Sequence, residues 1–337
     1  MQFEYTPPQT EIETALGGFR CINAYGPVNA GDDERFIEFL SRAEVPPRTE
    51  IYIDSGGGHV ETALNIGRTI REHWLSTSVG QYLLDTSNAA NQLILNRRWT
   101  PGRCMSAATM IYLGGRLRHL DSSSQFGVHQ FSFRDPSPDN LSRSQILSAK
   151  IARFVFDMGI PAEFLELSSA VNNDSIQIVP HEKLRELRVI TGGETTVDWT
   201  VQSRNNFLYI RGERDSLYGH HKMILGATKN GGFYVHAVIE SQGREEHLTQ
   251  FPLVELVFGG ENEKVIDISD TAVRTVVGIY TNILAPISND DAIELLNYNG
   301  IGLRVRGSKD AGMFLGIAPM SIDGSEDLVR SFIHILA

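Results

Sequence analysis

The 337 residues of this chain, 41% hydrophobic and 21% charged, have the composition of a folded globular protein and the length of two ordinary domains. The net charge of −11 argues against a nucleic-acid partner, and the two cysteines, Cys21 and Cys104, are too few for a disulfide scaffold or a cysteine-rich zinc site. Neither a signal-peptide pattern nor a run of roughly 18 apolar residues is found, so we expect a cytoplasmic protein with no membrane partner.

Strand and helix patterns alternate from residue 19 to about residue 190, which is typical of an α/β domain. Strands are predicted over residues 19–25, 50–55 and 76–84 and around 125–133. Apolar residues at helical spacing predict helices over residues 32–43, 60–74 and 140–158.

Residues 85–102 interrupt this alternation. The segment is rich in asparagine, contains Arg97, Arg98 and Trp99, and ends in Pro101 and Gly102. A loop of this length inside a compact domain is uncommon and often functional. Two interpretations stay open for it, a lid that shapes the specificity of a site and a plain surface excursion.

After Gly192 and Gly193 the pattern changes to short β segments separated by turn residues. We therefore predict a first domain over residues 1–195 and a second, mostly antiparallel β domain over residues 196–337, with short helices near 290–296 and 325–336. The second domain is expected to serve either recognition of a substrate or partner, or oligomerisation.

Three short motifs of the first domain carry candidate chemistry. Residues 54–60 (DSGGGHV) form a glycine-rich turn between a strand and a helix, which suits a phosphate loop, an oxyanion hole or a plain tight turn. Residues 102–108 (GRCMSAA) place Ser106 at the start of a small-residue helix, as a nucleophile or as a helix N-cap. Residues 126–130 (FGVHQ) place His129 at a strand end, as a structural residue or as the base for a serine.

Together and in this order, the motifs resemble the Clp-protease proteolytic subunit family, within the broader crotonase-like fold, over about residues 19–192. In that family a strand ends in a Ser-Pro-Gly-Gly-x-Val turn, which residues 55–60 match with Gly56 in the place of proline. The Gly-x-x-x-Ser segment that carries the nucleophile is matched by residues 102–108, and the (Ile/Val)-His-Gln strand by residues 128–130.

This resemblance implies an α/β, Clp-protease/crotonase-like domain of repeated β-β-α units with serine endopeptidase activity. Ser106 would be the nucleophile and His129 the base. Asp174, which precedes a short helical segment, would be the third member of the triad, with Asn172 and Asn173 as rivals.

The resemblance also implies the oxyanion donors, which would be the backbone N–H groups of Gly57, Gly58 and Ala107. It implies a protein or peptide substrate, a homo-oligomer, and no metal or other cofactor. An activating partner protein stays open, and the added β domain puts a simple proteolytic ring in question.

Other functions remain open. A catalytically silent, protease-like scaffold would use the β domain to engage a partner, and an acyl-CoA enzyme of the same fold would use two backbone oxyanion donors without a Ser–His pair. A Ser–Lys arrangement would use Lys150, while Cys104 is expected to be a buried apolar residue. Surface or cross-strand positions, rather than a metal site, are expected for His220, His221, His236 and His247.

Overall fold

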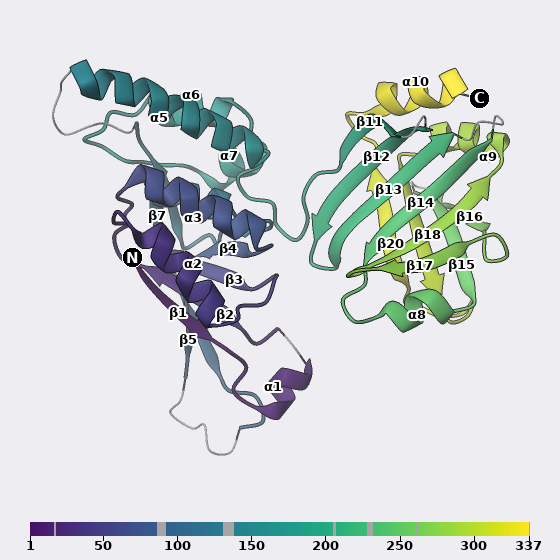
Figure 1. Cartoon of the computed structure of the whole chain (residues 1–337), viewed down its shortest axis with the longest axis horizontal. Coiled ribbons are helices and arrows are strands. Elements are labelled where there is room, and N and C mark those ends of the chain that lie inside the picture. Colours follow the sequence, from purple (N-terminus) through teal and green to yellow (C-terminus); the bar gives the residue numbers. More distant parts are fainter. Residues whose placement is uncertain are drawn as a thin grey trace. The chain divides into compact units, whose positions relative to one another are not determined.

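The computed structural model describes residues 1–16, 18–85, 92–130, 138–204, 207–227, 232–259 and 262–336. They form two compact units, Met1–Gly193 and Glu194–Ala337, which we call the first and the second unit (Figure 1). Among the described helices, none combines the length and the apolar character needed to cross a membrane.

The described residues of the first unit form an α/β structure with three sheets. The five-stranded sheet has the order β1 (Gln2–Thr6), β2 (Cys21–Tyr25), β3 (Glu50–Asp54), β4 (Ser76–Val79), β8 (Arg118–His119), and only the β1–β2 pair is antiparallel. A three-stranded sheet has the order β10 (Gln177–Ile178), β9 (Gln125–Val128), β7 (Arg103–Met105). A hairpin joins β5 (Gln81–Leu84) to β6 (Arg97–Thr100). The helices are α1 (Glu11–Leu16), α2 (Asp32–Arg42), α3 (Val60–Glu72), α4 (Ala108–Leu113), α5 (Pro138–Asp157), α6 (Glu163–Ser169) and α7 (His181–Glu186).

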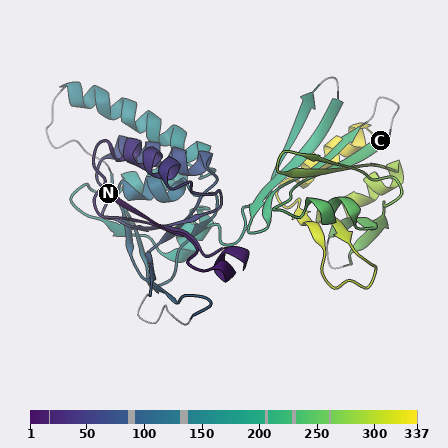
Figure 2. The ribbon, with the colours of Figure 1, turned by 60° about the horizontal axis from the view of Figure 1, so that its bottom comes forward.

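Alternate residues of β2 and β3 build the core of the first unit. Ile22, Ala24, Ile51 and Ile53 are at most 1% exposed and pack in one cluster with Phe36 of α2 and apolar residues of α3 and α4. Helices α3 and α5 lie on the same side of the five-stranded sheet in both views (Figures 1 and 2). The glycine-rich turn at the end of β3 therefore lies where the sheet meets its helical layer.

Helix α4 is held in place by close packing and by one buried cation. A Cβ on Gly114 would lie 2.2 Å from the Gly67 carbonyl oxygen, so α4 and α3 touch through their backbones. The buried Arg118 guanidinium donates to four carbonyl oxygens, those of Leu113, Gly115, Arg188 and Val189. Burial lowers the pKa of Arg118 to about 10, so the group stays charged at neutral pH. Arg118 thus joins the end of α4 to the last segment of the first unit.

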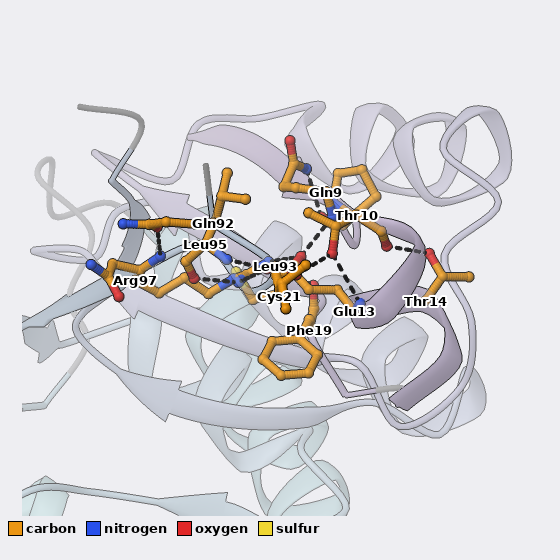
Figure 3. Close-up of polar contacts among 12 residues, drawn as sticks. Gln9, Thr10, Glu13, Thr14, Phe19, Cys21, Gln92, Leu93, Leu95 and Arg97 are labelled. Carbon is orange, nitrogen blue, oxygen red and sulfur yellow. Dashed lines mark hydrogen bonds and ion pairs between the residues drawn. The ribbon is translucent and has the colours of Figure 1, made fainter. Parts of the chain in front are cut away.

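Glu13 of α1 binds the loop end of the β5–β6 hairpin through Arg97, the first residue of β6 (Figure 3). The Oε1–Nη1 and Oε2–Nη2 distances are both 2.8 Å, and the side chains are 0% and 3% exposed. The N–H groups of Gln9 and Leu95 donate to the same carboxylate at 2.7 and 2.8 Å, and Arg97 also donates to the carbonyl oxygen of Phe19. This buried two-pronged pair fixes the segment around α1 to the hairpin.

The second unit is mostly antiparallel β. One sheet has the order β11 (Asp198–Arg204), β12 (Phe207–Ser216), β13 (Gly219–Ala227), β14 (Phe233–Glu240), β18 (Tyr280–Ile287), β17 (Val273–Val277). The other has the order β16 (Lys264–Asp267), β15 (Leu253–Gly259), β19 (Gly300–Arg306), β20 (Leu315–Ser321). Its helices are α8 (Glu245–Gln250), α9 (Asn289–Glu294), a 3₁₀ turn (Leu295–Asn297) and α10 (Glu326–Leu336). Side chains from both sheets and from α10 share one apolar core.

The coarse prediction of an α/β region followed by a β-rich region is confirmed, with two local corrections. The strand expected over 76–84 is two strands, because Gly80, with a φ of 136°, turns the chain out of the five-stranded sheet into the hairpin. Residues 97–100, expected inside a loop, are β6, which pairs with β5. Residues 86–91 of the expected loop and 131–133 of the expected strand lie outside the described residues.

Candidate active site

Ser106 occupies the turn between β7 and α4. Its φ of 56° lies in the left-handed region, which is uncommon for a residue other than glycine. Three hydrogen bonds hold this conformation: the Ser106 N–H donates to the Gly127 carbonyl at 2.9 Å, and the Ser106 carbonyl accepts from the N–H and hydroxyl of Thr109 at 3.0 and 2.6 Å. The first residue before α4 is Ala107, so the Ser106 hydroxyl does not serve as a side-chain cap of that helix.

His129 follows β9, which runs parallel to β7. The register pairs Met105 with Gly127, so both strands end at the same edge of the small sheet, next to Ser106 and His129. The distance from His129 Nε2 to Ser106 Oγ is 2.7 Å. This contact is within the range needed for a histidine to take the proton of a serine hydroxyl.

The other imidazole nitrogen, His129 Nδ1, is buried and has no hydrogen-bond partner among the described residues. Asp174 is not brought to it. The Ser175 N–H donates to the Asn172 carbonyl at 3.1 Å, which closes a turn and leaves Asp174 exposed at one of its two central positions. The sequence could not reveal this, because the motif gives the position of Asp174 along the chain but not the direction of its side chain.

The glycine-rich turn lies against Ser106. A Cβ on Gly57, whose φ is 95°, would be 2.8 Å from the Ser106 Cβ and 3.0 Å from the Ala107 nitrogen, so the turn packs directly against Ser106 and Ala107. The Gly57 N–H donates to Ser55 Oγ at 3.1 Å and is not available as an oxyanion donor. The N–H groups of Gly58 and Ala107 have no acceptor within the described part of the chain.

A pocket of about 480 Å³ opens beside Ser106 and His129. Its wall is mostly apolar and is formed by α4, α5 and α6, with Met110, Ile151, Ala152, Phe164 and Leu165 among the lining side chains. Its size is in the usual range for a ligand pocket.

The remaining candidates from the sequence lie elsewhere or are chemically silent. Burial raises the pKa of the Cys104 thiol well above its ordinary range, so this residue is not an activated nucleophile. Lys150 binds Glu61 with an Nζ–Oε1 distance of 2.6 Å, whereas the Ser106 hydroxyl contacts His129. No cluster of three or more metal-binding side chains is found among the residues described.

Neither the comparison with protein-family models nor that with curated proteins returned a match. Among solved structures, ClpP1 from Listeria monocytogenes and a point mutant of it are 16% identical to this chain, with TM-scores of 0.36 and 0.37. Both alignments cover 50% of this chain and 87% of the other.

Proposed function

We propose that the chain is a serine peptidase that hydrolyses peptide bonds in a protein or peptide substrate, with Ser106 as nucleophile and His129 as base. The observation that carries the proposal is the 2.7 Å contact between the Ser106 hydroxyl and His129 Nε2. Two backbone N–H groups have no acceptor within the described part of the chain: that of Gly58, in the turn whose Gly57 packs against Ser106, and that of Ala107, the residue after Ser106. A base, a hydroxyl and two donors are the parts that acyl transfer requires.

The reaction follows from these positions. His129 Nε2 removes the hydroxyl proton as Ser106 Oγ attacks the substrate carbonyl, and the oxyanion that forms accepts hydrogen bonds from the Gly58 and Ala107 amides. The protonated His129 then gives its proton to the leaving amine, and the C–N bond breaks. Water, deprotonated by the same imidazole, hydrolyses the acyl-enzyme and restores the Ser106 hydroxyl.

Substrate choice is assigned to the pocket beside Ser106. Because Met110, Ile151 and Phe164 line it, the pocket suits the apolar side chain of the residue whose carbonyl is attacked. Ala152 and Ser148 are small residues one helical turn apart on α5 and leave room for a bulky side chain.

The third position of the triad is proposed for Asp174 in the substrate-bound state. The turn that carries it is anchored to the histidine's own segment, since the Gln130 N–H donates to the Val171 carbonyl and Gln177 pairs with Val128. Asp174→Asn should then lower turnover by roughly tenfold or more without changing the fold. Unchanged turnover would remove Asp174 from the mechanism.

The second unit is proposed to recognise a protein substrate or partner, or to assemble the chain into an oligomer. A chain that ends after residue 195 separates the two roles, provided the first unit remains folded alone. Loss of self-association in sedimentation experiments would assign assembly to the second unit, whereas retained assembly with altered cleavage sites would assign recognition.

The proposed activity is tested with a fluorophosphonate–rhodamine probe and with casein as a protein substrate. We expect one adduct per chain, located at Ser106 by peptide mass spectrometry, which disappears in Ser106→Ala and slows by a factor on the order of 10⁴ in His129→Ala. Ser175→Ala, an exposed serine on the turn of Asp174, is the matched control and should label normally.

Two outcomes would contradict the proposal. If the unaltered chain shows no labelling and no casein cleavage, with or without candidate partners, it acts as a silent scaffold. If Ser106→Ala still hydrolyses acyl-CoA thioesters at the unaltered rate, the two backbone donors serve acyl-CoA chemistry instead.

A further inference from the structure

Ser55 joins the glycine-rich turn to its surroundings through side-chain and backbone hydrogen bonds. It directly follows β3, and its side chain is almost fully buried, at 2% exposed for the residue. Its Oγ donates to the Gly26 carbonyl at 2.7 Å and accepts from the Gly57 N–H at 3.1 Å. One buried hydroxyl therefore joins the loop after β2 to the glycine-rich turn.

The backbone of Ser55 is joined to the strand that leads to the nucleophile. Its N–H donates to the Arg103 carbonyl at 2.6 Å, and its carbonyl accepts from the Met105 N–H at 3.0 Å. Ser55 is thus fixed relative to β7, which ends one residue before Ser106. The contacts of the Ser55 side chain are therefore fixed in position relative to Ser106.

The orientation of the Gly57–Gly58 peptide depends on what holds Gly57. The Val28 N–H donates to the Gly57 carbonyl at 2.9 Å, and in a trans peptide the next N–H points the opposite way. This bond directs the Gly58 N–H away from Val28. The bond from the Gly57 N–H to Ser55 Oγ fixes the preceding peptide, so Gly57 is held on both sides.

We infer that Ser55 is a positioning residue, which holds Gly57 so that the Gly58 N–H faces the oxyanion formed at Ser106. This inference rests on the proposed function and deepens it. The hydroxyl itself does not touch the reacting atoms. Without it, the Gly57 N–H is left without its buried acceptor, and the peptides of the turn gain the freedom to rotate.

The test measures probe binding and reaction separately. The rate of labelling by fluorophosphonate–rhodamine is followed at increasing probe concentration, which gives a reversible binding constant and a maximal rate of covalent reaction. For Ser55→Ala we expect the maximal rate to fall about 10- to 100-fold, because the phosphonyl oxygen loses a well-placed donor, with binding unchanged within about twofold.

Ser124→Ala is the matched control. The Ser124 hydroxyl is also buried in the first unit, and it also joins two backbone groups, donating to the Val79 carbonyl and accepting from the Gly102 N–H. We expect Ser124→Ala to lower the melting temperature about as much as Ser55→Ala while labelling at the unaltered rate. A purely structural role for Ser55 would give the two variants the same behaviour.

Two further variants distinguish the loss of these hydrogen bonds from a failure of the chain to fold. Ser55→Thr keeps the hydroxyl and should restore the maximal rate to within about threefold, whereas Ser55→Cys keeps the volume, weakens both bonds and should stay at least about tenfold slow. Labelling of a folded Ser55→Ala or Ser55→Cys at the unaltered rate overturns the inference and leaves the proposed function standing. Absence of labelling in the unaltered chain removes both.

Discussion

The Glu13–Arg97 pair makes the free energy of unfolding of the first unit depend on pH. The substitution Glu13→Gln measures this contribution. Glu13→Gln keeps the size of the side chain and removes its charge. The carboxylate is buried and receives two bonds from Arg97 and one each from the Gln9 and Leu95 amides (Figure 3). The neutral amide cannot accept all four bonds, and the Arg97 guanidinium remains buried without an opposite charge.

The magnitude follows from the pKa of Glu13. Hydrogen bonds from Arg97 in particular, and from the two backbone amides, lower this pKa from 4.5 to about 2 against the effect of burial. At 1.36 kcal/mol per unit, the ionised carboxylate contributes about 3 kcal/mol to the free energy of unfolding at neutral pH. Because the folded pKa is the lower one, this contribution is fully present above about pH 4.5 and is lost as the pH falls towards about 2.

The assay is urea unfolding of both chains between pH 7 and pH 3, followed by tryptophan fluorescence. Trp199→Phe is introduced into both, so that only Trp74 and Trp99 of the first unit report. We expect Glu13→Gln to be less stable by about 3 kcal/mol at pH 7 and by roughly half of that at pH 3.

Glu61→Gln is the control, since Glu61 forms an ion pair with Lys150 in which the side chains are 48% and 50% exposed. Such an exposed pair contributes less than about 1 kcal/mol. A stability difference for Glu13→Gln that is the same at pH 7 and pH 3, or no larger than that of the control, would refute the reasoning.

Three further substitutions have defined outcomes. Gly57→Ala places a Cβ 2.8 Å from that of Ser106 at a φ of 95°, so labelling of Ser106 should slow by more than about 100-fold, and normal labelling would show that the turn is not part of the site. Arg118→Met leaves four carbonyl oxygens without their donor and should cost about 3 kcal/mol or more in thermal unfolding; a melting temperature within error of the unaltered chain would contradict this. Ala152→Phe fills the pocket and should lower kcat/KM at least about tenfold for peptides with a large apolar residue at the cleavage site while sparing those with alanine, as a peptide panel would reveal.

The sequence was informative about the residues that form the candidate site. The motifs placed Ser106 at the start of a helix and His129 at a strand end, and the parallel pairing of β7, a strand that the sequence did not predict, with β9 brings the two residues together. The glycine-rich turn was recognisable because its conformations require glycine, as the φ of 145° at Gly58 illustrates.

What could not be predicted depends on contacts between distant residues. Nothing near Ser55 in the sequence indicates that its hydroxyl donates to the carbonyl of Gly26, 29 residues earlier. Nor does the sequence show that the same hydroxyl accepts from the N–H of Gly57. The Glu13–Arg97 pair joins residues 84 positions apart and determines where the loop end of the hairpin lies. Asp174 was identified by its position before a helix, but a local turn directs its side chain into solvent.

The left-handed conformation of Ser106 places a cost in stability at the residue that is proposed to react. A residue with a Cβ loses roughly 1–2 kcal/mol in this conformation, whereas glycine does not. Of two variants that both lack the hydroxyl, Ser106→Gly should therefore be more stable than Ser106→Ala. Selection of random variants of the first unit for heat resistance alone should drive position 106 towards glycine, so serine would persist there only under selection for its reactivity.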